Sequence, residues 1–276
     1  MSETRSASRT ALAVATLRAY HHLVDGEPYV LDDPIAARII DPEMLAAIER
    51  RDERFAHPLG RGLRLSVLLR SRYAEDELAA AVAGGMRQFV SLGAGYDTFT
   101  YRQPAWAHEL RIFEVDHPAT QREKRARLER SAIALPGNLT FVPIDFETTA
   151  LLDALRAGGV DASRPVFFSW LGVIPYLSES AIDATFASIC TFPRGSAIVF
   201  SYANTATPQA LADAAGATGE PWLTRMEPDD FERLLRPLGF STISFLTPQD
   251  TETRYALSRL PMFDPPRFTN LGKATI

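Results

Sequence analysis

The sequence predicts an α/β protein built on a mostly parallel sheet, and three observations support this fold class. Short apolar segments alternate with helical segments from about residue 86 onward, the order that β-α-β units produce. These segments are apolar at successive positions, as in strands covered on both faces. The chain has 276 residues, 46% of them hydrophobic, so it can bury a large core without disulfides or metals.

The first 85 residues are predicted to be helical. A helix is expected over residues 10–22, which are rich in alanine and leucine. The segments "DDPIAARII" and "DPEMLAAIERR" follow, each opened by the Asp-Pro pair that is typical of a helix start. The longest helical signal covers residues 61–85 and ends in a Gly-Gly stop.

The middle of the chain supplies the predicted parallel sheet. We expect strands over residues 87–92, 110–116, 139–145, 165–173 and 195–203. Helices are expected between them over residues 117–132, 149–159 and 178–190. A further helix is expected directly after the Gly-x-Gly that ends the first strand.

The C-terminal third is less regular. Residues 204–226 are rich in glycine, proline and small side chains, which predicts a lid that is mobile without ligand. A helix over 227–240 precedes two strands, 241–247 and 254–261, expected to pair antiparallel, and no element is expected from Met262 onward. We interpret the chain as one domain, with a helical cover (1–85), a core (86–203), a lid (204–226) and a C-terminal part (227–276).

Composition excludes several classes of protein. The net charge of −5 disfavours a non-specific nucleic-acid binder, which needs an excess of Lys and Arg. The single cysteine, Cys190, excludes an intramolecular disulfide, and the five histidines never fall at i, i+4, so no metal site is expected. With no secretory h-region and no apolar run of about eighteen residues, we expect a cytoplasmic protein without a membrane span. The oligomeric state cannot be predicted.

The segment "VSLGAGYDTFTYR" carries the main functional signal. Gly93 and Gly95 end the first strand and allow close approach of a ligand, although such turns are also common without one. Asp116 ends the second strand, where a carboxylate accepts hydrogen bonds from ribose hydroxyls; the alternative is a helix cap. Thr98 stands where a dinucleotide fingerprint needs Gly or Ala, so a nucleoside without a pyrophosphate is favoured over NAD.

The segments "VSLGAGYDTFTYR", "FEVDHPATQREKRARL", "IDFE" and "WLGVIPYLSESAI", in this order, resemble the leucine carboxyl methyltransferase superfamily. Its bacterial branch of class I methyltransferases includes polyketide O-methyltransferases. The resemblance implies a Rossmann-like sheet of seven strands and S-adenosyl-L-methionine as cofactor. It also implies methyl transfer to a carboxylate or hydroxyl of a small, acidic molecule such as a polyketide.

The resemblance also implies roles for individual residues. Gly93 and Gly95 would approach the methionine part of the cofactor, and Asp116 would hold the ribose. Asp145 and Phe146 would flank the adenine, with a helix cap as the alternative for Asp145.

The family also places an arginine, on the helix before the first strand, against the cofactor carboxylate. Arg70 lies within the apolar stripe of that helix, whereas Arg72 lies on its opposite side. A buried cation needs an anionic partner, so we assign Arg70 this role, with a salt bridge to Glu77 as the alternative.

One position departs from the family pattern. Leu171 stands where many members have a glutamate for the cofactor's amino group, so main-chain carbonyls near Trp170 and Leu171 would substitute. Trp222 and Arg225, in the predicted lid, and Tyr176 are candidates for acceptor binding. No catalytic residue is assigned. An NAD(P)-dependent oxidoreductase and a non-catalytic cofactor-binding module remain alternatives.

Overall fold

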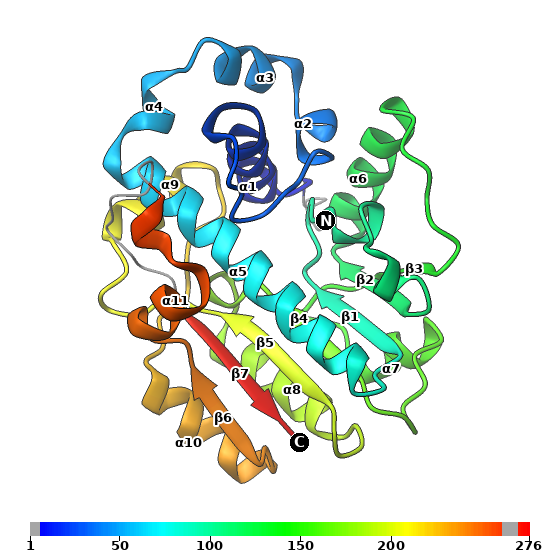
Figure 1. The fold of residues 1–276 in the computed structure, drawn as a ribbon. Helices are drawn as coiled ribbons and strands as arrows, with labels where there is room; N and C mark the ends of the chain where they lie inside the picture. Colours follow the sequence, from blue (N-terminus) through cyan, green and yellow to red (C-terminus); the bar gives the residue numbers. More distant parts are fainter. Residues whose placement is uncertain (1–5, 261–269) are drawn as a thin grey trace, which may run out of the picture.

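The computed structural model describes residues 6–260 and 270–276, and its centre is a seven-stranded sheet (Figure 1). The strand order is β3-β2-β1-β4-β5-β7-β6. Strands β1 to β5 are parallel, and β7 runs antiparallel to both β5 and β6, which confirms the predicted fold class. The strands are β1 Gln88–Leu92, β2 Arg111–Asp116, β3 Leu139–Pro143, β4 Phe167–Trp170, β5 Ala197–Ser201, β6 Thr242–Phe245 and β7 Leu271–Thr275.

Helices cover both faces of the sheet. Alternating residues of β1 enter different clusters: Val90 and Leu92 pack with the helices α7, α8 and α10, whereas Phe89 packs with α5. This two-sided burial explains the continuous apolar strands in the sequence. The helices are α5 Pro58–Ala83, α6 Pro118–Arg130, α7 Leu151–Ala157, α8 Glu179–Cys190 and α10 Pro228–Leu238.

The N-terminal residues form a helical cover beyond the tips of the parallel strands. In Figure 1 the arrowheads of β1 and β5 point toward this cover. Ala11 packs so close to Gly95 that a Cβ on that glycine would lie 3.1 Å from the alanine Cβ. The cover therefore closes over the loop that follows β1. It consists of α1 Arg9–Tyr20, a π-helical turn His21–Asp25, α2 Ala36–Ile39, α3 Pro42–Glu49 and α4 Glu53–Ala56.

The expected strand over 254–261 is wrong, and β7 comes from the C-terminal end of the chain instead. Thr247 and Asp250 form a capping box that begins helix α11, Pro248–Tyr255, and a 3₁₀ turn, Leu257–Arg259, follows. The expectation of no element from Met262 onward is wrong for Leu271–Thr275, while residues 261–269 lie outside the described part of the chain. Gly272 weakens the strand signal, yet it allows β7 to lie against the Phe200 ring.

The segment over residues 204–226 contains a helix that sequence reasoning did not predict. Helix α9 spans Gln209–Ala217, and Gly216 near its end lowers its helix propensity. The Glu220 carboxylate accepts hydrogen bonds from the Ser8 hydroxyl at 3.0 Å and from the Arg9 N–H at 2.7 Å. The segment is thus joined to the start of α1, and its predicted mobility stays a prediction.

Candidate active site

The glycine loop lies at the carboxyl end of β1, where the sheet order reverses between β1 and β4. Gly93 has φ +64° and Gly95 φ +49°, both in the left-handed region. A Cβ on Gly93 would lie 2.3 Å from a methyl carbon of Val173, in the loop after β4. The expected α-helix directly after this loop is wrong. A 3₁₀ turn, Phe99–Tyr101, follows instead, and its first N–H, that of Phe99, donates to the Asp97 carboxylate at 2.9 Å.

Asp116 connects the end of β2 to this loop. Its carboxylate accepts hydrogen bonds from the N–H groups of Gly95 and, at 2.6 Å, His117. Burial raises the pKa of Asp116 to about 6, although both hydrogen bonds oppose this shift. The cap of α6 is His117, not Asp116, so the structure does not support the alternative of a helix cap. The role of Asp116 toward a ribose stays a prediction.

Arg70 and Arg72, both on α5, have different environments. The Arg70 guanidinium lies against Gly172, where a Cβ would come within 2.6 Å of its Nη1. Burial, followed by the nearby Arg18, lowers the pKa of Arg70 to about 10, and within the described ranges it has no hydrogen bond or ion pair. Glu77, the alternative partner, binds Arg254 and Lys273 instead. Arg70 is therefore a partly buried cation without a partner among the described residues.

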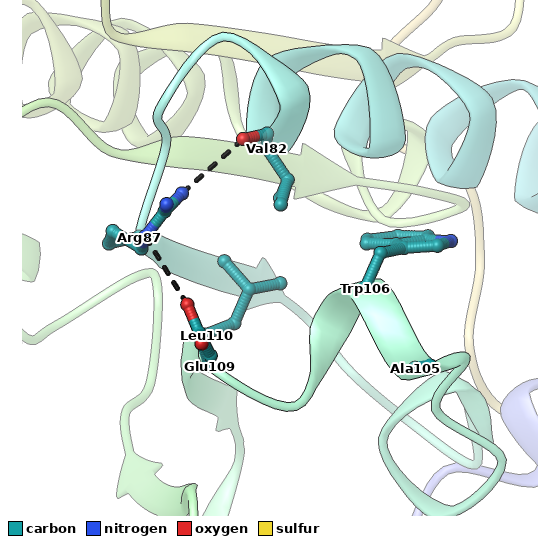
Figure 2. Close-up of a pocket in the computed structure, with 6 residues that line it drawn as sticks. All are labelled: Val82, Arg87, Ala105, Trp106, Glu109 and Leu110. Carbon is teal, nitrogen blue, oxygen red and sulfur yellow. Dashed lines mark hydrogen bonds and ion pairs between the residues drawn. The ribbon is translucent and has the colours of Figure 1, made fainter.

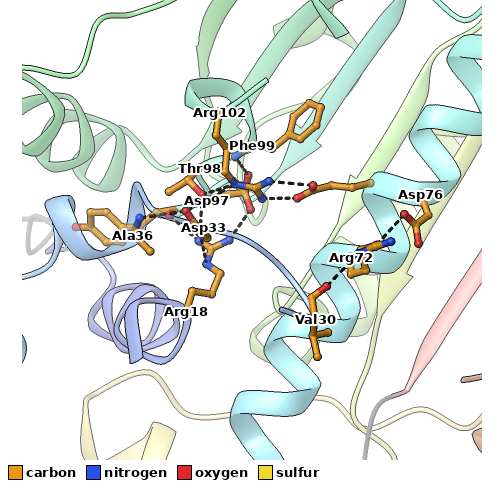
Figure 3. A network of polar contacts seen from close by, with 12 residues as sticks. Arg18, Val30, Asp33, Ala36, Arg72, Asp76, Asp97, Thr98, Phe99 and Arg102 are labelled. Atoms are coloured by element: carbon orange, nitrogen blue, oxygen red, sulfur yellow. Dashed lines mark hydrogen bonds and ion pairs between the residues drawn. The ribbon is translucent and has the colours of Figure 1, made fainter. Parts of the chain in front are cut away.

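Arg72, in contrast, is a surface residue. Its side chain is 43% exposed, and its Nε lies 2.9 Å from the Asp76 carboxylate one turn along the helix (Figure 3). Its Nη1 also donates to the Val30 carbonyl at 3.3 Å. Both arginines are partly exposed as whole residues, and they differ in their partners: Arg72 is paired with Asp76, whereas Arg70 is unpaired among the described residues.

Asp145 and Phe146 follow β3 at the same edge of the sheet. The Asp145 carboxylate accepts from the Glu147 N–H at 3.1 Å and closes a turn, while α7 begins only at Leu151. Phe146 is partly exposed, and its ring centroid lies 6.0 Å from that of Trp170, at the end of β4. Their predicted contact with an adenine is untested.

The loop after β4 carries Leu171, Gly172 and Tyr176. The side chain of Leu171 is partly buried against the cluster under α5. Gly172 has φ +72°, and its N–H donates to the Ser201 hydroxyl at 2.7 Å. Tyr176 forms an edge-to-face contact with Trp222, with ring centroids 6.4 Å apart. The structure thus brings together these two candidates for acceptor binding.

Arg225 is engaged within its own segment. It donates to the carbonyls of Asn204 at 2.7 Å and Thr207 at 2.8 Å, and to the side chain of Gln209 at 2.9 Å. Its guanidinium also lies 5.5 Å from the centre of the Trp222 ring. These contacts favour a structural role, and its predicted role in binding an acidic acceptor stays untested.

Sequence reasoning missed a buried ionic network beside the glycine loop (Figure 3). In the sequence alone, the acidic residue of "DDP" predicts only a helix cap, and Thr98 indicates only that a dinucleotide is disfavoured. In the structure the Thr98 hydroxyl donates to the Asp33 carboxylate at 2.7 Å, and both residues are fully buried. The signal available in the sequence was an arginine, Arg18, placed between the apolar residues Leu17 and Ala19 of α1.

Two cavities lie away from these residues. One, of about 260 Å³, is at the amino end of the sheet and is lined by Val82, Arg87, Ala105, Trp106, Glu109 and Leu110 (Figure 2). The other, of about 370 Å³, lies between α5, α11 and the β6–β7 edge, and its lining includes Tyr73, Glu77 and Phe245. Neither cavity contains a predicted site residue.

In the described ranges, 6–260 and 270–276, no helix has the length and apolar character to cross a membrane.

The site therefore consists of a glycine loop, a carboxylate at the end of β2 and a cation that is unpaired within the described part of the chain, all near the switch point of a doubly wound sheet. Comparison with known proteins identifies its class. The family model for leucine carboxyl methyltransferase matches residues 11–190. YktD of Bacillus subtilis, named as an S-adenosyl-L-methionine-dependent methyltransferase, is 33% identical over 91% of this chain and 92% of its own. A protein of Mycolicibacterium paratuberculosis with the same description is 30% identical over 79% and 73% of the two chains.

Solved structures agree with the fold. A DUF574 family protein from Streptomyces avermitilis superposes with a TM-score of 0.57 over 98% of this chain and 97% of its own, at 16% identity. A methyltransferase from Thermobifida fusca gives 0.55 over 94% and 93%, at 19% identity. The chain belongs to the leucine carboxyl methyltransferase family. The predicted class of enzyme, an S-adenosylmethionine-dependent methyltransferase, is confirmed.

Proposed function

We propose that this enzyme transfers a methyl group from S-adenosylmethionine to an oxygen of a small, acidic molecule such as a polyketide. One observation carries the cofactor half of the proposal: Arg70 is a desolvated guanidinium without a partner among the described residues, beside the glycine loop. A carboxylate of the cofactor would satisfy it. Asp116 would then accept hydrogen bonds from the ribose, and Asp145 with Phe146 would flank the base. The bound cofactor supplies an electrophilic methyl group on a sulfonium.

Methyl transfer to a carboxylate acceptor requires no general acid or base. A carboxylate is ionised at neutral pH, so its oxygen attacks the methyl carbon in line as the carbon–sulfur bond breaks. The products are a methyl ester and a neutral thioether, and no proton moves. The enzyme's contribution is then to position two reactants and exclude water. A hydroxyl acceptor would additionally need a base, and we assign none.

The acceptor is proposed to bind beside Tyr176 and Trp222. The Trp222 Nε1 is buried without a hydrogen-bond partner in the described structure, so it has a donor available for an acceptor oxygen. The 204–226 segment also lies outside residues 11–190, which the family model matches. The family match therefore does not specify the acceptor. For the cofactor's amino group, main-chain carbonyls near Trp170 and Leu171 substitute for the family glutamate.

The test has two parts. Calorimetry with S-adenosylhomocysteine measures cofactor binding, with NADH as the control for the oxidoreductase alternative. Incubation with methyl-labelled cofactor and a panel of small carboxylic acids and phenols, followed by mass spectrometry, measures transfer. Labelled methyl esters support the proposal. Label on phenols alone identifies a hydroxyl acceptor, and binding without any transfer to the panel contradicts the acceptor class.

A further inference from the structure

Asp33 occupies the centre of the buried network beside the glycine loop. It comes from the N-terminal cover, between the π-helical turn and α2, and its side chain is 0% exposed. Its carboxylate accepts from the Thr98 hydroxyl at 2.7 Å and from the Ala36 N–H at 3.0 Å. The guanidinium nitrogens of Arg18 and Arg102 lie 3.4 Å and 3.7 Å away. A single carboxylate thus joins the cover to the chain after β1.

Arg18 extends this connection to the next two residues of the loop. Its side chain is 2% exposed, and its Nη1 donates to the Asp97 carboxylate at 2.8 Å. Its Nη2 donates to the Tyr96 carbonyl at 2.7 Å. Together, Arg18 and Asp33 fix the three consecutive residues 96–98, which directly follow Gly95. Figure 3 shows Arg18 and Arg102 directed from opposite sides toward the carboxylates of Asp33 and Asp97.

Two charges of the network, on Arg18 and Asp97, act on Arg70. Asp33, Asp97 and Glu75 supply three carboxylates, whereas Arg18 and Arg102 supply two guanidiniums. Arg70 experiences attraction from Asp97 and repulsion from Arg18. In a desolvated site such charges act strongly only when their positions are fixed, because a small displacement changes the local field.

We propose that Asp33 is a positioning residue for the cofactor: it holds residues 96–98 so that the glycine loop and Arg70 present the correct geometry to the ligand. The inference rests on the proposed use of this loop as the cofactor site. Asp33 itself touches no ligand in this account and acts through Thr98 and Arg18.

The test compares Asp33→Asn with a matched control, Asp25→Asn. Asp25 lies in the same cover and is 6% exposed, and it forms a buried ion pair with Arg64 at 2.7 Å, but it has no contact with residues 93–98. Both substitutions remove one buried charge. Calorimetry at a temperature well below each Tm gives the affinity for S-adenosylhomocysteine, and calorimetric unfolding gives stability.

Asp33→Asn is expected to weaken S-adenosylhomocysteine binding about tenfold, in the range of a lost charge-assisted hydrogen bond. Asp25→Asn is expected to lower Tm while its affinity stays at the wild-type value. Equal affinities for wild type and Asp33→Asn, or equal losses in both variants, would overturn the proposal. A wild-type protein that binds no S-adenosylhomocysteine would instead refute the proposed function.

A second pair of variants covers the case in which Asp33→Asn does not fold. Thr98→Val removes the hydroxyl that bonds Asp33 and keeps the side-chain shape, whereas Thr98→Ser keeps the hydroxyl. We expect the valine variant to lose affinity severalfold and the serine variant to retain it. A serine variant as weak as the valine variant would contradict positioning through this hydrogen bond.

Discussion

Burial brings the pKa of Asp116, in the candidate site, close to neutral pH. Its carboxylate accepts two backbone N–H groups, yet desolvation dominates and raises its pKa to about 6. The ionised form is a charged acceptor at both oxygens, whereas the neutral acid has one weakly accepting hydroxyl oxygen, so the ionised form binds two ribose hydroxyls more strongly. The affinity for the cofactor should therefore depend on pH near this value.

We expect S-adenosylhomocysteine affinity to be constant above about pH 7 and to fall as the pH drops through about 6. The sign follows from the protonation state: below the raised pKa, the neutral acid predominates and must lose its proton before binding. Calorimetry between pH 5 and pH 8 measures this profile. Asp116→Asn is the control, since its amide does not titrate. The same fall in that variant would assign the pH dependence to another group.

Removing the Asp116 side chain should weaken binding at neutral pH. We expect Asp116→Ala to lose about 1.5–3 kcal/mol, the range for hydrogen bonds to a charged group. The measurement is calorimetry with S-adenosylhomocysteine, with far-UV circular dichroism to establish that the variant folds. A folded variant with unchanged affinity would exclude Asp116 as the ribose ligand.

At the scale of elements, the close packing of β7 against β5 favours glycine at position 272. Gly272 faces Phe200 on the neighbouring strand, and a Cβ there would lie 2.3 Å from the ring. The strand occupies an interior position between β5 and β6, so the sheet cannot easily move apart. The glycine is thus required by sterics.

We expect Gly272→Ala to lower the free energy of unfolding by about 1–3 kcal/mol through overpacking. Gly216→Ala is the matched control in α9, where a Cβ would meet nothing within 4 Å. Better helix propensity should make this variant more stable by up to about 1 kcal/mol. Urea denaturation of both variants measures the difference. Equal stability of Gly272→Ala and wild type would show that the sheet relaxes around the added methyl group.

The elements that sequence patterns predicted were those that bury their own apolar face. The five parallel strands, α5 and α8 are of this kind, and their limits agree within a few residues. Strand β7 was missed because its stability depends on neighbours distant in sequence. Among site residues, the stripe of α5 separated Arg70 from Arg72, whereas the network around Asp33 depends on contacts across 65 residues, which no local pattern contains.

At the scale of the whole molecule, Glu77 joins three distant parts of the chain. Its carboxylate accepts from Arg254 of α11 at 2.6 Å and from Lys273 of β7 at 2.5 Å. Although burial alone would raise the pKa of Glu77, the hydrogen bonds and charges of Lys273 and Arg254 lower it overall. These contacts connect α5 to the C-terminal edge of the sheet.

The contribution of Glu77 to the free energy of unfolding should be fully present above the ordinary pKa of a glutamate. It should be lost as the pH falls through the lowered pKa of Glu77 in the folded protein. A depressed pKa means that the unfolded chain binds this proton first on acidification, which favours unfolding. We expect Glu77→Gln to lower Tm at pH 7 and to make Tm less dependent on pH in the acid range. Calorimetric scans from pH 7 to pH 3 test this, and parallel acid profiles for variant and wild type would contradict it.

The central claim is that the Arg70 guanidinium, which has no partner among residues 6–260 and 270–276, binds the carboxylate of the cofactor. Calorimetric titration of S-adenosylhomocysteine into Arg70→Met, with Arg72→Met as the matched surface control, tests it most directly. We predict that Arg70→Met loses about 1.5–3 kcal/mol of binding free energy, the range of a charge-assisted hydrogen bond, while Arg72→Met stays within about 0.5 kcal/mol of wild type. Equal affinities of the two variants, or a weaker Arg72→Met, would contradict the account.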